Sequence, residues 1–170
     1  IQVLGITHPP VSLDEVANFL SLELVPSKFQ SDDVCGVLAV QDKHGVIGYN
    51  SSHPKSRQRF SIAHEIGHYV LHVLHARRKT GQELYVDKTN SVGVVYFRDD
   101  KSTRGEYEHE IEANGFAAAL LMPKHMIMEA VGNSVIDLDD ESFLAELAET
   151  FGVSKMAMTY RIGRLYSSHT

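Results

Sequence analysis

Two histidines stand four residues apart at residues 64 and 68, with Glu65 between them. On an α-helix the side chains of residues i and i+4 are neighbours on one face, with Cβ atoms roughly 5–6 Å apart. This spacing allows the imidazole nitrogens of His64 and His68 to bind one zinc ion at bonds of about 2.0–2.1 Å. Glu65 is rotated by about 100° from His64, too far to share the ligand face but close enough to reach a water on the metal. The HExxH pattern therefore predicts a centre for zinc-assisted peptide hydrolysis, with Glu65 as its catalytic residue.

A catalytic zinc site takes a third protein ligand and leaves one position open for water. The extended pattern HExxHxxGxxH would place that ligand at residue 74, but the chain has Leu71 and Leu74 at its glycine and histidine positions. His72 and His75 are on the same helix, where a third ligand would crowd the open position. We therefore expect both of these histidines to lie outside the set of metal ligands.

A later helix is the better source of the third ligand. Residues 106–123 predict a helix with a polar start and an apolar end, stopped by Pro123. Glu110 and Asn114 are four residues apart on one face, so Glu110 can bind zinc while Asn114 steadies a ligand histidine. Glu112 is a close competitor for the role of third ligand, and helix geometry alone does not decide between the two carboxylates.

Residues 59–72 and 110–123 closely resemble the two signature segments of the ImmA/IrrE family of zinc metallopeptidases, and the resemblance runs from about residue 34 to 166. It implies that His64, His68 and Glu110 bind Zn²⁺, that Glu65 is the general base, and that the layout is similar to a reduced thermolysin-like fold. It also implies a protein substrate, a helix-turn-helix repressor, whose cleavage switches on stress or mobile-element genes. The alternative is a non-catalytic zinc-containing regulator that binds a repressor or DNA.

Peptide hydrolysis also needs a group that stabilises the oxyanion and a surface that aligns the substrate. Tyr69, Tyr107 and His109 are the candidates for the first role, and the sequence does not rank them. Extended peptides usually dock by adding a strand to a free sheet edge. Residues 46–50 are interpreted either as such an edge strand or as an ordinary core strand.

The remaining elements predict an α+β fold. Ser12 and Glu15 form a capping box that opens a helix extending to about residue 22. Strands are expected at about 34–40, 45–49 and 92–97, with a turn at 42–45. We expect a small, mainly antiparallel sheet packed on the HExxH helix and on the second ligand-bearing helix.

The last third of the chain predicts a helix-turn-helix-like hairpin. Residues 143–151 and 154–166 form two helices, with Ser154 as the N-cap of the second. The hairpin carries Arg161 and Arg164 besides Lys155, but many carboxylates precede it and the chain has a net charge of −6, which opposes phosphate binding. We therefore expect a hairpin packed on the peptidase core, with no DNA contact by this chain alone.

Length and composition set the limits of these expectations. The 170 residues, 43% of them hydrophobic, suit one domain with a small appendage. We divide them into a zincin-like metallopeptidase domain at 1–132 and a C-terminal helical segment at 133–170. No run of about 20 apolar residues and no signal peptide is visible. The only cysteine, Cys35, excludes an internal disulfide, is expected to be a buried small side chain, and suits a reducing compartment. A cytoplasmic protein without a membrane partner is expected.

Overall fold

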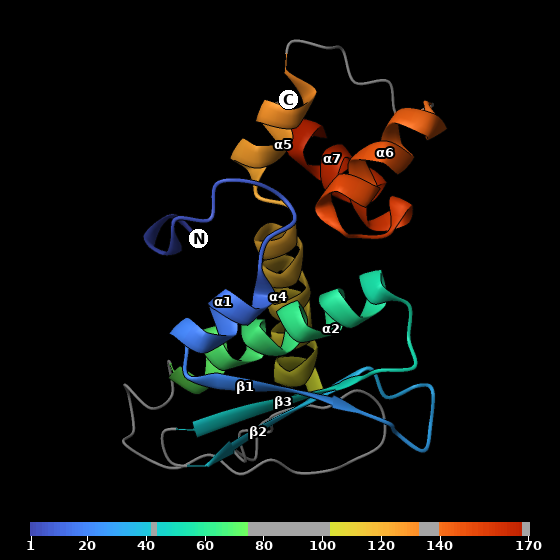
Figure 1. Ribbon diagram of the computed structural model, residues 1–170. Coiled ribbons are helices and arrows are strands. Elements are labelled where there is room, and N and C mark those ends of the chain that lie inside the picture. Colours follow the sequence, from blue (N-terminus) through green and yellow to red (C-terminus); the bar gives the residue numbers. More distant parts are fainter. Residues whose placement is uncertain (42–43, 75–102, 133–139, 168–170) are drawn as a thin grey trace.

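The computed structural model describes residues 1–41, 44–74, 103–132 and 140–167 (Figure 1). A three-stranded sheet forms the base of the molecule, with β1 (Leu22–Ser27), β2 (Gly36–Gln41) and β3 (His44–Asn50) in the order β1-β3-β2. β1 runs parallel to β3, whereas β2 and β3 form an antiparallel hairpin. The α+β class and the small sheet are confirmed, and the sheet is mixed, with one pairing of each kind.

Helices cover the sheet and extend away from it. Figure 1 shows α1 and α2 on one face of the sheet, α4 running behind them, and α5, α6 and α7 gathered at the end farthest from the sheet. The helical elements are η1 (Gln2–Leu4), α1 (Leu13–Phe19), α2 (Lys55–His68), the π-helical turn η2 (Tyr69–Val73), α4 (Thr103–Leu121), α5 (Lys124–Val131), α6 (Glu141–Phe151) and α7 (Lys155–Ser167). No helix within the described ranges is long and apolar enough to cross a membrane.

The N-terminal helix is shorter than predicted. The backbone N–H of Glu15 donates to the Ser12 Oγ at 3.3 Å, so the predicted start is confirmed. The helix ends at Phe19, however, and Ser21 adopts a left-handed conformation with φ of 59°, after which β1 begins. The expected continuation to residue 22 is wrong, and β1 was not predicted. Its parallel partner β3 is distant in sequence, so local periodicity does not reveal the pairing.

The HExxH helix α2 is buried on almost every side from Ser61 to His68, because the sheet covers one side and α4 the other. Leu38 on β2 and Ile47 on β3 lie opposite each other and share one apolar core with Ile66 of α2. Gly67 lets α4 come close, since a Cβ at this position would lie 3.1 Å from the carbonyl oxygen of Ala113. The second predicted helix is confirmed as α4.

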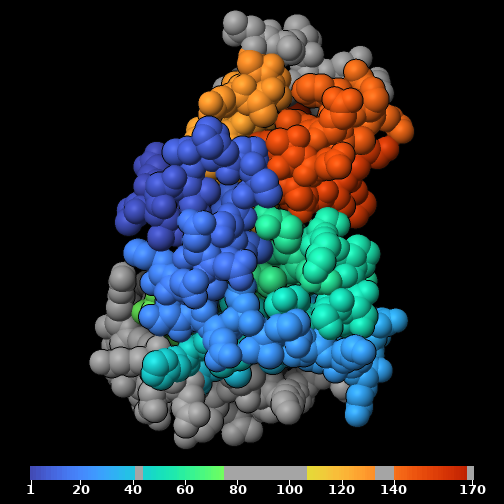
Figure 2. Space-filling model, in the orientation of Figure 1, coloured from blue at the N-terminus to red at the C-terminus, as the bar shows by residue number. Residues whose placement is uncertain are grey.

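The C-terminal hairpin is confirmed. Asp140 caps α6 through the backbone N–H groups of Ser142 and Phe143, and Ser154 caps α7 by accepting from the N–H of Ala157 at 3.2 Å. The turn at Gly152 lies against α2, because a Cβ there would be 2.9 Å from the Arg59 Nε. Figure 2 shows the C-terminal helices resting on the start of α2 on this face.

The domain division and the strand at 92–97 are not tested by the structure, and one helix was missing from the sequence prediction. The division of the chain at residue 132 stays a prediction. The strand at 92–97 and residues 42–43 of the expected turn lie outside the described residues. Helix α5 was not predicted, because Pro123 was interpreted only as the end of α4, whereas it is also the N-cap of α5.

Candidate metal centre

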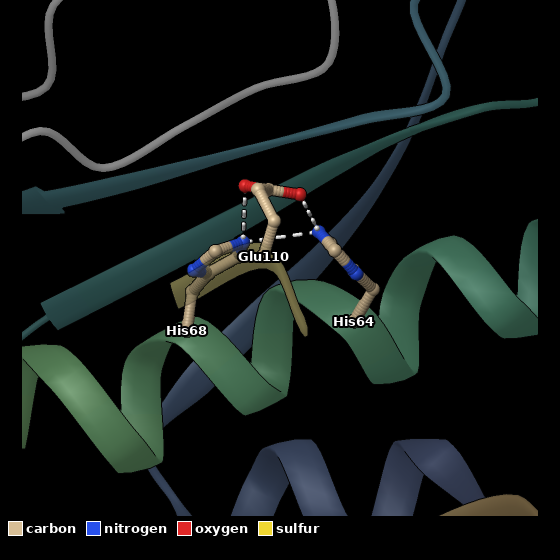
Figure 3. A group of neighbouring side chains, drawn as sticks. All are labelled: His64, His68 and Glu110. Atoms are coloured by element: carbon tan, nitrogen blue, oxygen red, sulfur yellow. Dashed lines mark hydrogen bonds and ion pairs between the residues drawn. The ribbon is translucent and has the colours of Figure 1, made fainter. Parts of the chain in front are cut away.

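Three side chains from two helices converge on one point (Figure 3). The Nε2 atoms of His64 and His68, both on α2, lie 3.0 Å apart. Glu110 of α4 places its Oε2 3.3 Å from the Nε2 of His64 and its Oε1 3.1 Å from the Nε2 of His68. The ligand atoms of the three residues all lie within 4.8 Å of one another. The i, i+4 spacing on α2 and the close packing of α4 produce this convergence.

The hydrogen bond of His64 to Asn114 shows which nitrogen is free for a metal. The Nδ1 of His64 lies 3.0 Å from the Oδ1 of Asn114, and an amide oxygen only accepts hydrogen bonds, so Nδ1 donates. In the neutral tautomer with a proton on Nδ1, the lone pair of His64 is on Nε2, which lies near the Nε2 of His68 and the carboxylate of Glu110. A cation placed between these atoms would interact favourably with all of them. The three residues therefore could hold a divalent metal ion, and the expected contact of Asn114 with His64 is present. The assignment of these residues as ligands stays a prediction.

Glu110 is suited to remain ionised at this point. Burial alone would raise the pKa of its carboxyl, but the neighbouring His64 and His68 outweigh burial and bring the pKa to about 2. Its Oε1 is buried without a hydrogen-bond partner and lies 3.1 Å from the Nε2 of His68. A carboxylate held in this state is the negative ligand that a His₂Glu zinc site requires.

Glu65 lies beside this group, in a protein environment that offers it no partner. Its side chain is only 1% exposed, and neither carboxylate oxygen has a hydrogen bond. Burial, and then the charge of Glu110, raise the pKa of Glu65 well above its ordinary value. Gly36, the first residue of β2, makes room for it, since a Cβ there would lie 3.1 Å from the Oε1. A buried carboxylate with a perturbed pKa and no partner is typical of a functional group and not of a structural one.

The competing carboxylate and the neighbouring histidine lie apart from the converging group. Glu112 places its Oε2 3.8 Å from the Nδ1 of His72 and is not part of the convergent set. Burial, together with His109 and His68, lowers the pKa of His72 to about 4, so this ring is neutral at pH 7 and its contact with Glu112 is not an ion pair. The ring of His72 stacks on that of His109, with centroids 3.9 Å apart. His75 lies outside the described residues.

The three candidates for stabilising the oxyanion have different surroundings. Tyr69 is buried against β3, near the position that a Cβ of Gly45 would occupy. His109 stacks on His72, whereas Tyr107 on the same helix is 69% exposed. None of these surroundings decides between the three residues, so the role of each in stabilising the oxyanion stays a prediction.

The strand pairings decide between the two interpretations of residues 46–50. These residues belong to β3, which pairs on both sides, so the core-strand interpretation is confirmed and the edge-strand interpretation is wrong. Among the described strands, β2 pairs on one side only and passes Glu65 at Gly36. Sequence reasoning did not find the role of Gly36, because it lies far from Glu65 in the sequence and no local pattern joins them.

Comparisons with known proteins agree with this geometry. The peptidase family described as the IrrE N-terminal-like domain matches residues 16–163. The chain is 32% identical over 130 residues to the radiation response metalloprotease IrrE of Deinococcus radiodurans, an alignment that covers 73% of this chain and 32% of that protein. The fold is similar to that of a Mycobacterium tuberculosis transcriptional regulator, with a TM-score of 0.58 at 17% identity over 92% of this chain and 42% of that one. The chain thus spans about a third of the length of the curated relative it matches.

Proposed function

Because this chain belongs to the family of IrrE N-terminal-like peptidase domains, we propose that it is a zinc-dependent endopeptidase. The observation that carries the proposal is the convergence of His64, His68 and Glu110 beside the buried and unpartnered Glu65. Two imidazole nitrogens and one carboxylate are a ligand set that catalytic zinc uses, and three protein ligands leave one position open.

A zinc ion held by these residues would lower the pKa of a water molecule towards 7 and polarise the scissile carbonyl. Glu65 then acts as the general base: it accepts a proton from the attacking water and delivers it to the leaving amine. Asn114 keeps the Nδ1 proton of His64 in place, so that the Nε2 stays available to the metal.

A substrate peptide is proposed to extend along the edge of β2 that pairs with no described strand. Peptides that add a strand to a sheet gain backbone hydrogen bonds, which do not depend on sequence. Support for this position comes from the place of β2 at one end of the described sheet and from its contact with Glu65 at Gly36.

The proposed substrate is a helix-turn-helix repressor in a stress or mobile-element response, which would place the protein in the cytoplasm. The resemblance of the signature segments supports this substrate, and so does the radiation response in the name of the similar Deinococcus protein. The alternative of a DNA-binding regulator has less support. Lys155 pairs with Glu141 at 3.0 Å, so one basic group of α7 is engaged within the protein.

The test combines metal analysis with a cleavage assay. Elemental analysis of the purified protein is expected to give one zinc per chain. The zinc-loaded protein is then incubated with the repressor encoded beside its gene, and mass spectrometry identifies fragments. Glu65→Gln is expected to keep the zinc and to lose at least a hundredfold in cleavage rate. Fragments formed equally fast by Glu65→Gln would refute the mechanism, and zinc with an intact repressor and tight operator binding would favour the regulator.

A further inference from the structure

A pocket of about 290 Å³ lies between α4 and α7. Apolar groups line much of it, among them Phe60 of α2 and Met122 at the end of α4. Its polar groups are Asn114 of α4 and, from α7, Tyr160, Arg161 and Arg164. A volume near the lower end of the range for ligand pockets suits an amino-acid side chain better than a large cofactor.

The pocket adjoins the candidate metal centre. Asn114 lines it and also holds the Nδ1 of His64 at 3.0 Å. Phe60 precedes His64 by one turn of α2, and the two rings are 6.4 Å apart between centroids. Asn114 likewise follows Glu110 by one turn of α4. An extended peptide advances about 3.3 Å per residue, so two residues span about the 6.4 Å between the rings of Phe60 and His64, and we take this as the reach from a peptide bond at the metal to the pocket.

The charge of the pocket is opposite to that of the chain. Its two arginines contribute two positive charges, whereas the whole chain has a net charge of −6. Among the described residues, no carboxylate forms an ion pair with either guanidinium. Arg161 is held in place because its Nε donates to the carbonyl oxygen of Met122 at 3.1 Å. Burial, and then the charge of Arg164, lower the pKa of Arg161, which is the environment that an added anion would relieve.

These observations identify the chemistry of the occupant. Glutamate has two methylene groups that can pack on Phe60 and Met122, and a carboxylate that matches the planar donors of a guanidinium. We propose that this pocket is a substrate subsite that selects an acidic side chain, glutamate before aspartate, within two residues of the scissile bond. Helix α7, with Arg161 and Arg164, thus supplies a specificity determinant of the peptidase. This inference rests on the proposed function for its cleavage test, but not for its binding test.

The cleavage test uses the zinc-loaded full chain and an unbiased library of octapeptides, with cleavage sites determined by mass spectrometry. Glutamate is expected to be enriched at one position within two residues of the cleaved bond. Arg164→Glu is expected to reduce the ratio of kcat/KM for matched glutamate and glutamine peptides about tenfold and to favour lysine at that position. Lys155→Glu is the matched control, because it changes the charge of the same helix equally at a site outside the pocket.

The binding test separates the inference from the proposed function. Glu65→Gln loaded with zinc is titrated with two fluorescein-labelled octapeptide pools that differ only in glutamate or glutamine at one position. Tighter binding of the glutamate pool, lost in a variant that combines Glu65→Gln with Arg164→Glu, supports the subsite even if the wild-type protein cleaves nothing. Cleavage or binding without a preference for glutamate overturns it, as does an equal shift in Arg164→Glu and Lys155→Glu.

Discussion

Replacement of Gly67 by alanine tests whether the close approach of α2 and α4 sets the spacing of the metal ligands. The added Cβ would lie 3.1 Å from the carbonyl oxygen and 3.2 Å from the Cα of Ala113, and 3.2 Å from the Cδ1 of Phe116. Two of these three atoms belong to the backbone, which cannot rotate away as a flexible side chain can. Helix α4 must therefore shift by a few tenths of an ångström, and Glu110, one turn before Ala113, moves with it.

The sign of the effect on stability follows from two opposing terms. In a helix interior alanine is favoured over glycine by about 1 kcal/mol. Overpacking a well-packed core typically costs about 1–3 kcal/mol. We therefore expect Gly67→Ala to lower the free energy of unfolding by up to about 2 kcal/mol, and the displaced Glu110 to lower zinc affinity about tenfold.

Urea denaturation of the metal-free protein measures the first quantity, and competition with a chelator measures the second. Gly163→Ala on α7 is the matched control, since a Cβ there has no atom within 4 Å. The control is expected to gain about 0.5–1 kcal/mol of stability and to bind zinc as the wild type does. A Gly67→Ala protein that matched this control in both measurements would refute the argument.

The other predictions concern the groups around the ligands. Glu110→Gln is expected to yield protein without zinc in elemental analysis, whereas Glu112→Gln keeps one zinc per chain; the reverse result would exchange their roles. Asn114→Ala is expected to weaken zinc binding about 10–100-fold in chelator competition, and Asn114→Asp, which keeps an acceptor for His64, less; equal losses would contradict the hydrogen-bond argument. In the metal-free protein the pKa of His72 is about 4, below its unfolded value of 6.5, so protonation favours the unfolded state and stability falls as pH drops from 6.5 to 4. Urea titrations at pH 7.5 and 4.5 measure how much the free energy of unfolding decreases between these two pH values. His72→Phe is expected to make this decrease smaller by about 1–3 kcal/mol, and an unchanged decrease would exclude His72 as its source.

The parts of the site that local periodicity controls could be predicted from sequence. The spacing of His64 and His68 on a helix determines a shared face, and the same rule places Asn114 beside the carboxylate of Glu110. The caps Ser12 and Ser154 determine where α1 and α7 begin, because a side-chain oxygen meets backbone N–H groups only a few residues away.

The parts that depend on distant contacts could not be predicted. Strand β1 exists because it pairs with β3, and no pattern within residues 22–27 signals a parallel partner. Pro123 has two roles, because it stops α4 from continuing and is also the N-cap of α5. The space that Gly36 leaves for Glu65, and the pocket between α4 and α7, arise only when separate elements pack together.

The convergence of acceptor atoms at the candidate metal centre links the stability of the folded protein to the concentration of the cation. Because His64, His68 and Glu110 are assembled only in the native chain, an ion that binds them stabilises the native state at the expense of the unfolded one. At a free concentration 1,000 times the dissociation constant, this linkage amounts to about 4 kcal/mol, a large share of the usual 5–15 kcal/mol for a domain. Where such an ion is scarce, a larger fraction of the chain would be unfolded and accessible to proteases.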